Sequence, residues 1–431
     1  MLNKRISLLA LGILAAANQA MADDQSNAKG FVEDSHLDVF LRNGYMYRDF
    51  KHGAEDKSEW GQAATATFTS GFTPGTVGVG VDAFGMYAVR LDGGQGRSGA
   101  AGIDFFKQGD SGHAADDLSR GGAAIKARIS NTVIKVGDQM PALPVLTYDN
   151  SRLLPETFNG TMITSKEIEG LELNVGRFTQ EVRKSATSSD SGHLKRIDVF
   201  GGSYKFTDNF SASLYGSDNE DVAKKQYLNL NYVQPLAEKE SLTFDFNGYK
   251  TKLDSDFADQ FYGGNRDNTI WSLAATYAID AHSFTLAHQR STGDTGYNYG
   301  FYQEVDGVPT GALGDGGSTI WLANSYWSDF NAEDERSWQV SYAIDFGAYG
   351  MPGLSYRVAY VRGDNIRTAD TSDGTEREIF NQLQYVVQDG PAKNLSLRLR
   401  SSWVRVSNDA SAYNSDGNEV RAFVEYPISI F

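Results

Sequence analysis

The sequence predicts an all-β protein: a transmembrane antiparallel β-barrel of about 18 strands, with loops folded inward to form a constriction. Apolar and polar residues alternate along segments spread over the whole chain. This period of two is typical of strands whose faces meet different surroundings. Short and long connections alternate between these segments, as they do in outer-membrane barrels. After the N-terminal segment, no run approaches the ~20 consecutive apolar residues that a membrane-spanning helix needs.

Composition and charge exclude several classes of function. The 431 residues include 45 Gly, 22 Tyr and 24 Phe but no Cys, which excludes disulfides, cysteine zinc sites, iron–sulfur clusters and thiol catalysis. The formal net charge of −16 repels nucleic-acid phosphates, so no nucleic-acid partner is expected. The Gly-rich stretch 92–96 has no following helix that would form a phosphate cradle. We therefore expect no cofactor.

The N-terminal residues 1–22 have the three parts of an export signal. A short basic region precedes an apolar stretch over 6–17, and a small-x-small cleavage site follows at 20–22. The alternative, a buried N-terminal helix, fits these three parts less well. We expect residues 1–22 to be a signal peptide and residues 23–431 to form the transmembrane β-barrel channel domain.

The alternation is clear in the first segment after the signal. Odd positions carry Val39 and Leu41, whereas even positions carry Asp38 and Arg42. Because successive side chains of a strand point to opposite faces, one face is apolar and the other polar. Strands are expected at 36–49, 58–72, 76–91, 121–129, 132–139, 158–165, 169–181, 195–206, 209–217, 222–234, 240–252, 268–279, 282–291, 336–346, 353–362, 377–388, 393–406 and 418–431.

The apolar face of these segments favours a barrel in lipid over a soluble sandwich. A sandwich would bury many bulky Leu and Ile residues between its two sheets. Here Ala and Gly are mixed into the apolar face and aromatic residues gather near strand ends, as in the lipid-facing band and girdles of an outer-membrane barrel. Eighteen strands enclose an aqueous channel, whereas eight fill with their own side chains. These features indicate a pore.

The last expected strand leaves the closure of the barrel open. It ends on the aromatic residue Phe431, but its apolar series Val424, Tyr426 and Ile428 has the opposite parity. Pro427 also lacks a backbone donor for pairing. The sequence does not establish how this strand pairs with the first one.

One connection has the composition of a loop that packs inside the pore. Residues 140–157 hold three of the nine prolines together with several aliphatic residues, so the loop is stiff and apolar. Irregular backbone is tolerated at membrane depth where it borders protein and water. We expect this loop to fold inward; the alternative is a loop packed outside against a partner in a trimer.

Arginine positions follow the same alternation. Arg42, Arg48, Arg398 and Arg400 lie opposite to apolar neighbours and are expected inside the barrel. An arginine on the lipid face near the midplane would cost about 2–4 kcal/mol. The same rule places Arg128 and Arg357 inside the barrel. It places three other arginines on the apolar face, at strand ends in the membrane interface: Arg177, Arg290 and Arg362.

The inward arginines can have two roles, and the two are compatible. They can pair with acids to hold the wall, and a row of guanidinium groups can also guide anions, because each presents a fork that matches a carboxylate. The acids considered as partners are Asp38, Asp82, Asp149 and Glu425.

Several runs of sequence resemble the OprD family of outer-membrane channels. The similar runs are Lys29–Ser35, Ala124–Thr132, Lys135–Pro141, Asp149–Phe158, Gly293–Tyr297 and Tyr360–Ile366. The resemblance spans essentially the whole mature chain. It implies a monomeric or weakly associating barrel, integral to the outer membrane of Gram-negative bacteria of the pseudomonad type, that admits small carboxylate-bearing solutes. Lipid and lipopolysaccharide would be its surroundings.

The resemblance also implies roles for particular residues. Loop 140–157 would fold inward and loop 292–335 would help to narrow the channel. Arg152 would sit at the constriction with Asp149 and Ser151 beside it. A basic ladder along the wall would consist of Arg42, Arg48, Arg128, Arg183, Arg290, Arg362, Arg398 and Arg400. Arg290 and Arg362 match the family's segments but fail the parity rule, so their orientation is open.

No motif indicates an enzyme. None of the six histidines lies in a Gly-x-Ser-x-Gly or His-Glu-x-x-His pattern, and we expect neither catalysis nor a bound metal. The expected function is a substrate-selective channel for aromatic, cyclic or aliphatic organic acids, and amino acids are a further candidate class. The alternative is a surface barrel that acts chiefly as an adhesin or receptor. The preferred solute is not determined by the sequence.

Overall fold

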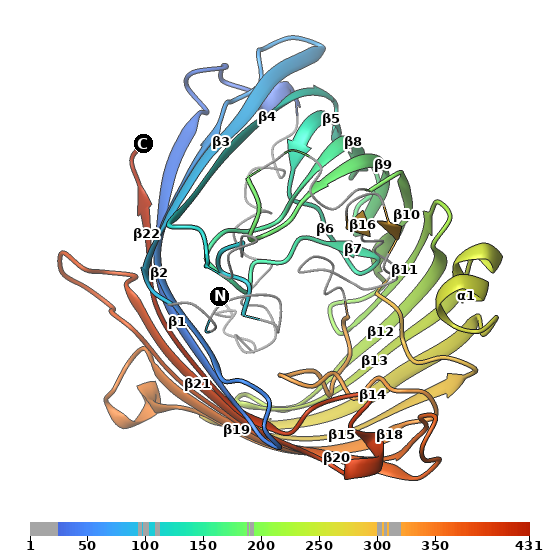
Figure 1. Ribbon diagram of the computed structural model, residues 1–431. Coiled ribbons are helices and arrows are strands. Elements are labelled where there is room, and N and C mark those ends of the chain that lie inside the picture. Colours follow the sequence, from blue (N-terminus) through green and yellow to red (C-terminus); the bar gives the residue numbers. More distant parts are fainter. Residues whose placement is uncertain are drawn as a thin grey trace.

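The chain forms a closed antiparallel barrel of 18 strands (Figure 1). The computed structural model describes residues 25–93, 97, 103–107, 113–187, 189, 194–299, 304–305, 308–309 and 320–431, so the expected signal peptide lies outside the described residues. The barrel strands are β1 (His36–Phe50), β2 (Lys57–Thr69), β3 (Val77–Asp92), β4 (Asp117–Ile129), β5 (Thr132–Gln139), β8 (Thr157–Ser165), β9 (Leu171–Val182), β10 (Ile197–Lys205), β11 (Phe210–Asn219), β12 (Ala223–Ala237), β13 (Glu240–Leu253), β14 (Asp267–Ile279), β15 (His282–Gly293), β18 (Arg336–Asp345), β19 (Leu354–Ile366), β20 (Gly374–Val386), β21 (Ser396–Val406) and β22 (Gly417–Ser429).

Each barrel strand pairs with the next along the chain, and the last pairs with the first. In this closing pair Asp38 lies opposite Ser429 and Phe50 lies opposite Gly417. The expected strand number is confirmed, and the closure that the sequence left open is an ordinary antiparallel ladder. The largest difference at a strand start is in β4, which begins at Asp117 rather than 121 because Leu118 continues the inward alternation and is buried.

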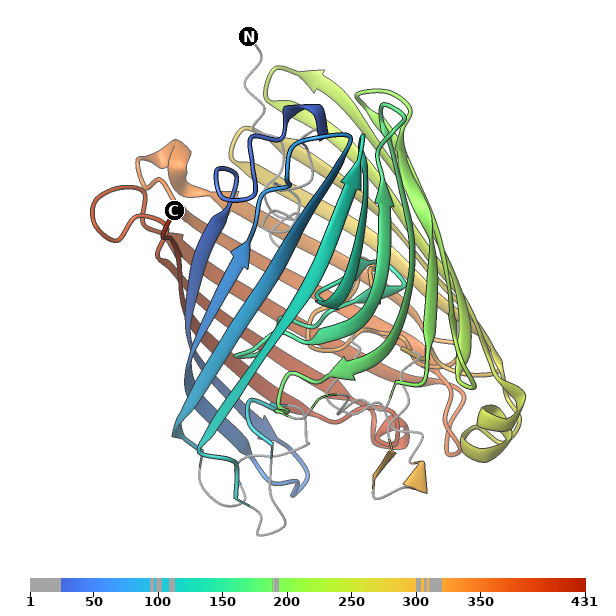
Figure 2. The ribbon, with the colours of Figure 1, turned by 90° about the horizontal axis from the view of Figure 1, so that it is seen from above.

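The two ends of the barrel differ in the length of their connections. At one end tight turns join neighbouring strands, as at Ser130, whose positive φ of 50° lets β4 reverse into β5. The other end carries the long connections and the short helix α1 (Ser255–Phe261) (Figure 2). Long loops face the cell exterior in outer-membrane barrels, so we call these the periplasmic and extracellular ends.

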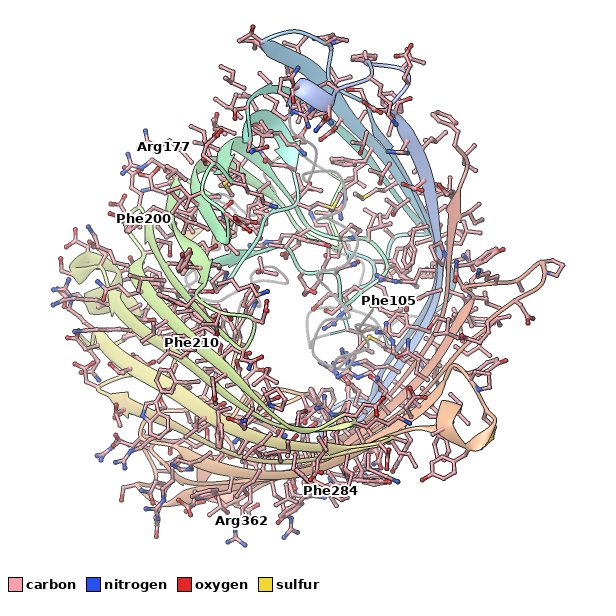
Figure 3. The ribbon with its side chains drawn as sticks, turned by 180° about the vertical axis from the view of Figure 1, so that it is seen from behind. Phe105, Arg177, Phe200, Phe210, Phe284 and Arg362 are labelled. Atoms are coloured by element: carbon pink, nitrogen blue, oxygen red, sulfur yellow. The ribbon has the colours of Figure 1, made fainter. Side chains whose placement is uncertain are left out.

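Side chains on the strands alternate between lipid and lumen. On β4 the outward Ile125 is 68% exposed, whereas the inward Lys126 and Arg128 are buried. Phe200 and Phe284 likewise point away from the barrel, and Phe105 lies within it (Figure 3). No helix among the described residues is long and apolar enough to cross a membrane.

Candidate functional site

The loop after β5 crosses the lumen and divides it. Within it, the two-residue strands β6 (Ala142–Leu143) and β7 (Leu146–Thr147) pair and lie inside the ring of strands (Figure 1). Leu143, Val145 and Leu146 are buried in a cluster with inward side chains of the wall from β8 to β14. The Tyr249 hydroxyl of β13 donates to the carbonyl of Pro144 at 2.9 Å. The expected inward folding is confirmed.

The far end of the same loop is anchored on the opposite wall. Leu153 and Leu154 are buried among apolar residues of β1 to β4 and β22, such as Met46, and beside Phe105 of the connection before β4. This approach requires a glycine on β2, because a Cβ added at Gly61 would lie 2.4 Å from Leu153 Cδ1. Both ends of the loop are thus fixed by apolar packing, and its polar middle is held between them.

The polar middle brings together the three residues expected at the constriction. The Ser151 amide donates to Asp149 Oδ1 at 2.7 Å, and Arg152 Nη1 donates to Ser151 Oγ at 2.7 Å. Arg152 Nε donates to the carbonyl of Ile103, in the segment before β4. The Arg152 side chain is therefore buried between two loops, and it lies among the charged neighbours of Arg48 on β1.

Asp149 is the charged anchor of this turn. Lys184, just after β9, donates to Asp149 Oδ2 at 2.7 Å. Burial opposes ionisation of Asp149, but the charges of Lys184 and Arg152 outweigh it and hold the pKa of Asp149 well below its usual range. Glu156 closes the turn by accepting from the Asp149 amide at 2.8 Å. Burial and the nearby carboxyls of Glu181 and Asp149 raise the pKa of Glu156.

Beside this loop, one wall of the lumen carries a row of guanidinium groups. Arg42 and Arg48 on β1, Arg421 on β22, and Arg398 and Arg400 on β21 all point inward, as the opposite parity of their exposed neighbours requires. Arg400 lies directly opposite Arg421, and Arg398 directly opposite Phe423. The inward orientation that parity gave to the β1 and β21 arginines is confirmed.

Carboxylates on β22 balance part of this charge. Glu425 Oε1 accepts from Arg42 Nε at 2.9 Å and from Arg398 Nη2 at 3.1 Å. Glu419 accepts from Arg48 Nε at 2.7 Å and also pairs with Arg421. These buried pairs fix the arginines to the wall. The Arg398 side chain stays 28% exposed, whereas that of Arg42 is 5% exposed, so Arg398 offers more of its surface to a solute.

Aromatic faces support the same guanidinium groups. Arg398 lies over the Phe423 ring at 5.2 Å, Arg400 over the Phe380 ring at 4.9 Å, and Arg48 over the Trp327 ring at 5.1 Å. Such stacking attracts a cation while leaving the edge of its planar group available for hydrogen bonds. The arrangement holds several positive groups in defined orientations along one face of the channel.

The end of the long connection between β15 and β18 forms a second inward segment, 320–335. The Trp327 amide donates to Glu378 Oε1 of β20 at 3.1 Å. The Ser328 amide donates to Oε2 of the same carboxylate at 3.0 Å. On the other side of the lumen the Trp321 amide donates to the Tyr249 hydroxyl at 3.1 Å. The expectation that the connection over 292–335 narrows the channel is supported by this segment, which follows the inner wall from β13 to β20.

The wall facing the arginine row carries mainly tyrosines and amides, and its charged side chains include Lys225 on β12 and Asp245 on β13. Tyr227 donates to Asn247 at 2.5 Å, and Tyr249 packs against Tyr227 with ring centroids 4.8 Å apart. Within the described part of the chain, no group of three His, Asp or Glu side chains is placed to hold a metal ion. The channel therefore has a guanidinium wall on one side and a tyrosine and amide wall on the other.

Two other members of the expected ladder lie apart from this row. Arg128 is near the periplasmic end of β4, where its Nε donates to Gln25 at 2.9 Å and its guanidinium lies 4.3 Å from the Phe72 ring centre. Arg183 follows β9, and its carbonyl accepts from Arg120. Neither residue contributes to the row on β1, β21 and β22.

The placement of Arg290 and Arg362 in the ladder is wrong. Both side chains are exposed on the outer face, and Figure 3 shows Arg362 pointing away from the barrel. Their strand neighbours Gln289 and Val361 are buried on the lumen side, so parity fixes the outward orientation. No bulge intervenes between these arginines and the apolar positions that set the parity.

Sequence reasoning missed several charged residues of the lumen. Arg421 alternates with the outward Val420 and Ala422, so the parity rule that found Arg398 also identifies it. Lys184 lies in a connection, where no period applies. Arg120 donates to the carbonyls of Pro155 and Arg183 and so ties two connections together; its parity on β4 was overlooked because the expected strand began after it.

A barrel of 18 strands with an apolar outer face and a charged lumen narrowed by two inward segments defines a channel protein of the porin class. Residues 29–430 match the family model described as outer membrane porin, OprD family. The chain belongs to this family and is an integral outer-membrane porin.

Similar proteins agree with this assignment. Porin D of Pseudomonas aeruginosa is 42% identical, with 98% of each chain covered. The crystal structure of Acinetobacter baumannii OccAB1 superposes with a TM-score of 0.88 and 40% identity, over 95% of this chain and 100% of that one. The Pseudomonas aeruginosa OpdK structure with vanillate gives a TM-score of 0.80 and 33% identity, over 93% of this chain and 100% of that one.

Proposed function

We propose that this porin selects small solutes that carry a carboxylate. The observation that carries the proposal is the row of inward arginines on β1, β21 and β22, which faces a wall made mainly of tyrosines and amides. A neutral solute gains little from such a wall. A carboxylate can exchange its water for forked N–H donors that are already oriented.

The row suits passage because it offers several sites in succession. A hydrogen bond to a charged group contributes about 1.5–3 kcal/mol net, enough to attract a solute, and conduction requires that each site also release it. Glu425 and Glu419 already occupy part of the donor capacity of their partners. A solute therefore competes with a wall carboxylate at each step and is not trapped.

We assign Arg152, with Ser151 and Asp149, to the narrow section. Arg152 donates to Ile103 and Ser151 and lies near Arg48, so it holds the crossing loop against the segment before β4. In this role it sets the width of the gap and adds positive charge beside the row. Asp149 acts through Lys184, as the anchor that keeps the turn in place.

Vanillate, present in the structure of the similar protein OpdK, is an aromatic carboxylate, which supports the same solute class here. The relatives named above are porins, which favours a channel over an adhesin or receptor. One chain supplies both walls and the crossing loop, so we also propose that the functional unit is a monomer. A detergent-corrected molar mass equal to one chain would support this.

Two measurements on the purified protein test the solute class. In a planar bilayer the protein should give steady single-channel currents, whereas a plugged adhesin would give none. In liposomes, benzoate should enter faster than benzamide, which matches its size but is neutral. Equal rates for the acid and the amide would refute carboxylate selection, even if the channel conducts.

A further inference from the structure

The outer face of the barrel carries a belt of arginines near its extracellular end. The belt is made by Arg290, Arg336, Arg362, Arg377 and Arg405, one on each of the consecutive strands β15, β18, β19, β20 and β21. Each lies within a few residues of the end of its strand that joins a long connection. Figure 3 shows Arg362 pointing outward from the barrel.

Members of the belt are direct neighbours across the sheet. Arg290 lies opposite Arg336, Arg362 opposite Arg377, and Arg377 opposite Arg405. Like charges in directly opposed positions destabilise a sheet. Arg336 has an acidic partner, Asp364, at 2.5 Å, and Arg405 donates to Asn418 at 2.9 Å. For Arg290, Arg362 and Arg377, the described residues provide no ion pair or side-chain hydrogen bond.

On the other side of the barrel, outward basic residues form ion pairs with acidic residues of the same chain. Arg177 on β9 holds Asp198 of the neighbouring strand with contacts of 2.6 and 3.0 Å. Lys224 pairs with Asp218 at 2.9 Å, and Lys195 with Asp221 at 2.9 Å. Basic residues there are balanced by the chain itself. Along the belt they form a surface that lacks most of its counter-charge.

Below each belt arginine, two residues nearer the membrane centre, lies a large ring or apolar side chain. These residues are His288, Trp338, Tyr360, Ile379 and Trp403. A groove of about 430 Å³ on the outer face is lined by Tyr360, Arg377, Ile379, Trp403 and Arg405. The groove thus joins guanidinium groups at the headgroup level to aromatic surfaces at the depth where girdles meet sugars and acyl chains.

We propose that this belt binds the phosphorylated headgroup of the glycolipid that forms the outer leaflet. Guanidinium groups match phosphate oxygens with two parallel hydrogen bonds. A phosphate between Arg362 and Arg377 would relieve their repulsion, while the first sugar and acyl segments would contact the rings below. The proposal rests on the outer-membrane location and not on the choice of transported solute.

The test compares lipid retention by the parent and by a triple variant, Arg290→Gln, Arg362→Gln and Arg377→Gln. The matched control, Arg177→Gln, Lys195→Gln and Lys224→Gln, removes the same charge from exposed positions that have acidic partners, two on strands and one in the connection before β10. Folded protein in detergent is incubated with bisphosphorylated lipid A, its dephosphorylated form or phosphatidylglycerol, and bound copies are counted by native mass spectrometry. Heat-modifiable gel mobility verifies folding, and the double variant Arg362→Gln and Arg377→Gln serves if the triple variant does not fold.

The belt variant should retain lipid A at least about tenfold less than the parent, while the control should match the parent. The dephosphorylated lipid should be retained poorly by all proteins. Equal retention by the belt variant and the parent would overturn the proposal, as would equal retention of the phosphorylated and dephosphorylated lipids. Phosphatidylglycerol bound as well as lipid A would overturn the glycolipid assignment. Benzoate uptake by the belt variant should stay at the parent level, so failure of the lipid site and failure of the solute proposal are separable.

Discussion

Arg400 and Arg421 lie directly opposite each other on β21 and β22, with both side chains on the lumen face. Their mutual repulsion is offset by Glu419, which pairs with Arg421, and by the Phe380 ring beneath Arg400. A wall built only for stability would place an acid opposite each base. This pair instead leaves positive charge facing the channel, and that relationship underlies the proposed selection of carboxylates.

Removing the side chain of Arg152 should lower carboxylate uptake strongly while small-ion current persists or rises. Arg152→Ala deletes a positive charge at the narrow section and also deletes the group that holds the crossing loop to Ile103. Uptake of benzoate into liposomes and single-channel conductance in potassium chloride measure the two effects. A folded variant that transports benzoate as well as the parent would make Arg152 a purely structural partner of the loop.

Neutralising Glu425 should shift ion selectivity towards anions. This carboxylate serves both Arg42 and Arg398, so Glu425→Gln leaves two guanidinium groups with less counter-charge. Because breaking a buried pair costs about 3–5 kcal/mol, the barrel should also unfold at a lower temperature on heated gels. The reversal potential in a salt gradient measures the selectivity. A reversal potential unchanged from the parent would contradict the placement of both arginines in the ion path.

Adding bulk at Gly61 should widen the channel by displacing the crossing loop. The Cβ of Gly61→Val would meet Leu153 at 2.4 Å, a contact that forces the loop anchor to move. Gly85→Val on the neighbouring strand is the control, since a Cβ there meets no atom within 4 Å. Single-channel conductance should rise for the first variant and stay near the parent value for the second. Equal conductance in all three proteins would show that the Leu153 anchor does not set the width.

Removing Lys184 should make the channel sensitive to mild acid. Lys184 and Arg152 hold the pKa of Asp149 below its usual range, so the anchoring contribution of Asp149 is present above its unfolded pKa, about 3.9. That contribution is lost only as the pH falls through the pKa of Asp149 in the folded protein, which is lower than its pKa in the unfolded chain. In Lys184→Met the pKa of Asp149 in the folded protein should rise, because the larger of the two positive charges that oppose the effect of burial is removed. On acidification, the conductance of the variant should therefore change at a higher pH than that of the parent.

The strands and the inward arginines of β1 and β21 were predictable because both follow from a single period of two. Arg421 obeys the same rule and was overlooked. The ladder positions given to Arg290 and Arg362 came from resemblance and failed where parity disagreed. The partnership of Asp149 with Lys184 joins two connections that are far apart in sequence, and no local pattern encodes such a contact. Inward folding of the crossing loop was predictable from its prolines and aliphatic residues, but its two anchors were not.

The guanidinium wall should distinguish an acid from a neutral molecule of the same size. The most direct measurement is the ratio of benzoate to benzamide uptake in liposomes for the parent, for Arg398→Gln with Arg400→Gln, and for the outer-face control Arg177→Gln. The parent and the control should share a ratio well above one, and the lumen variant should approach one while remaining folded. A lumen variant that keeps the parent ratio would contradict the account.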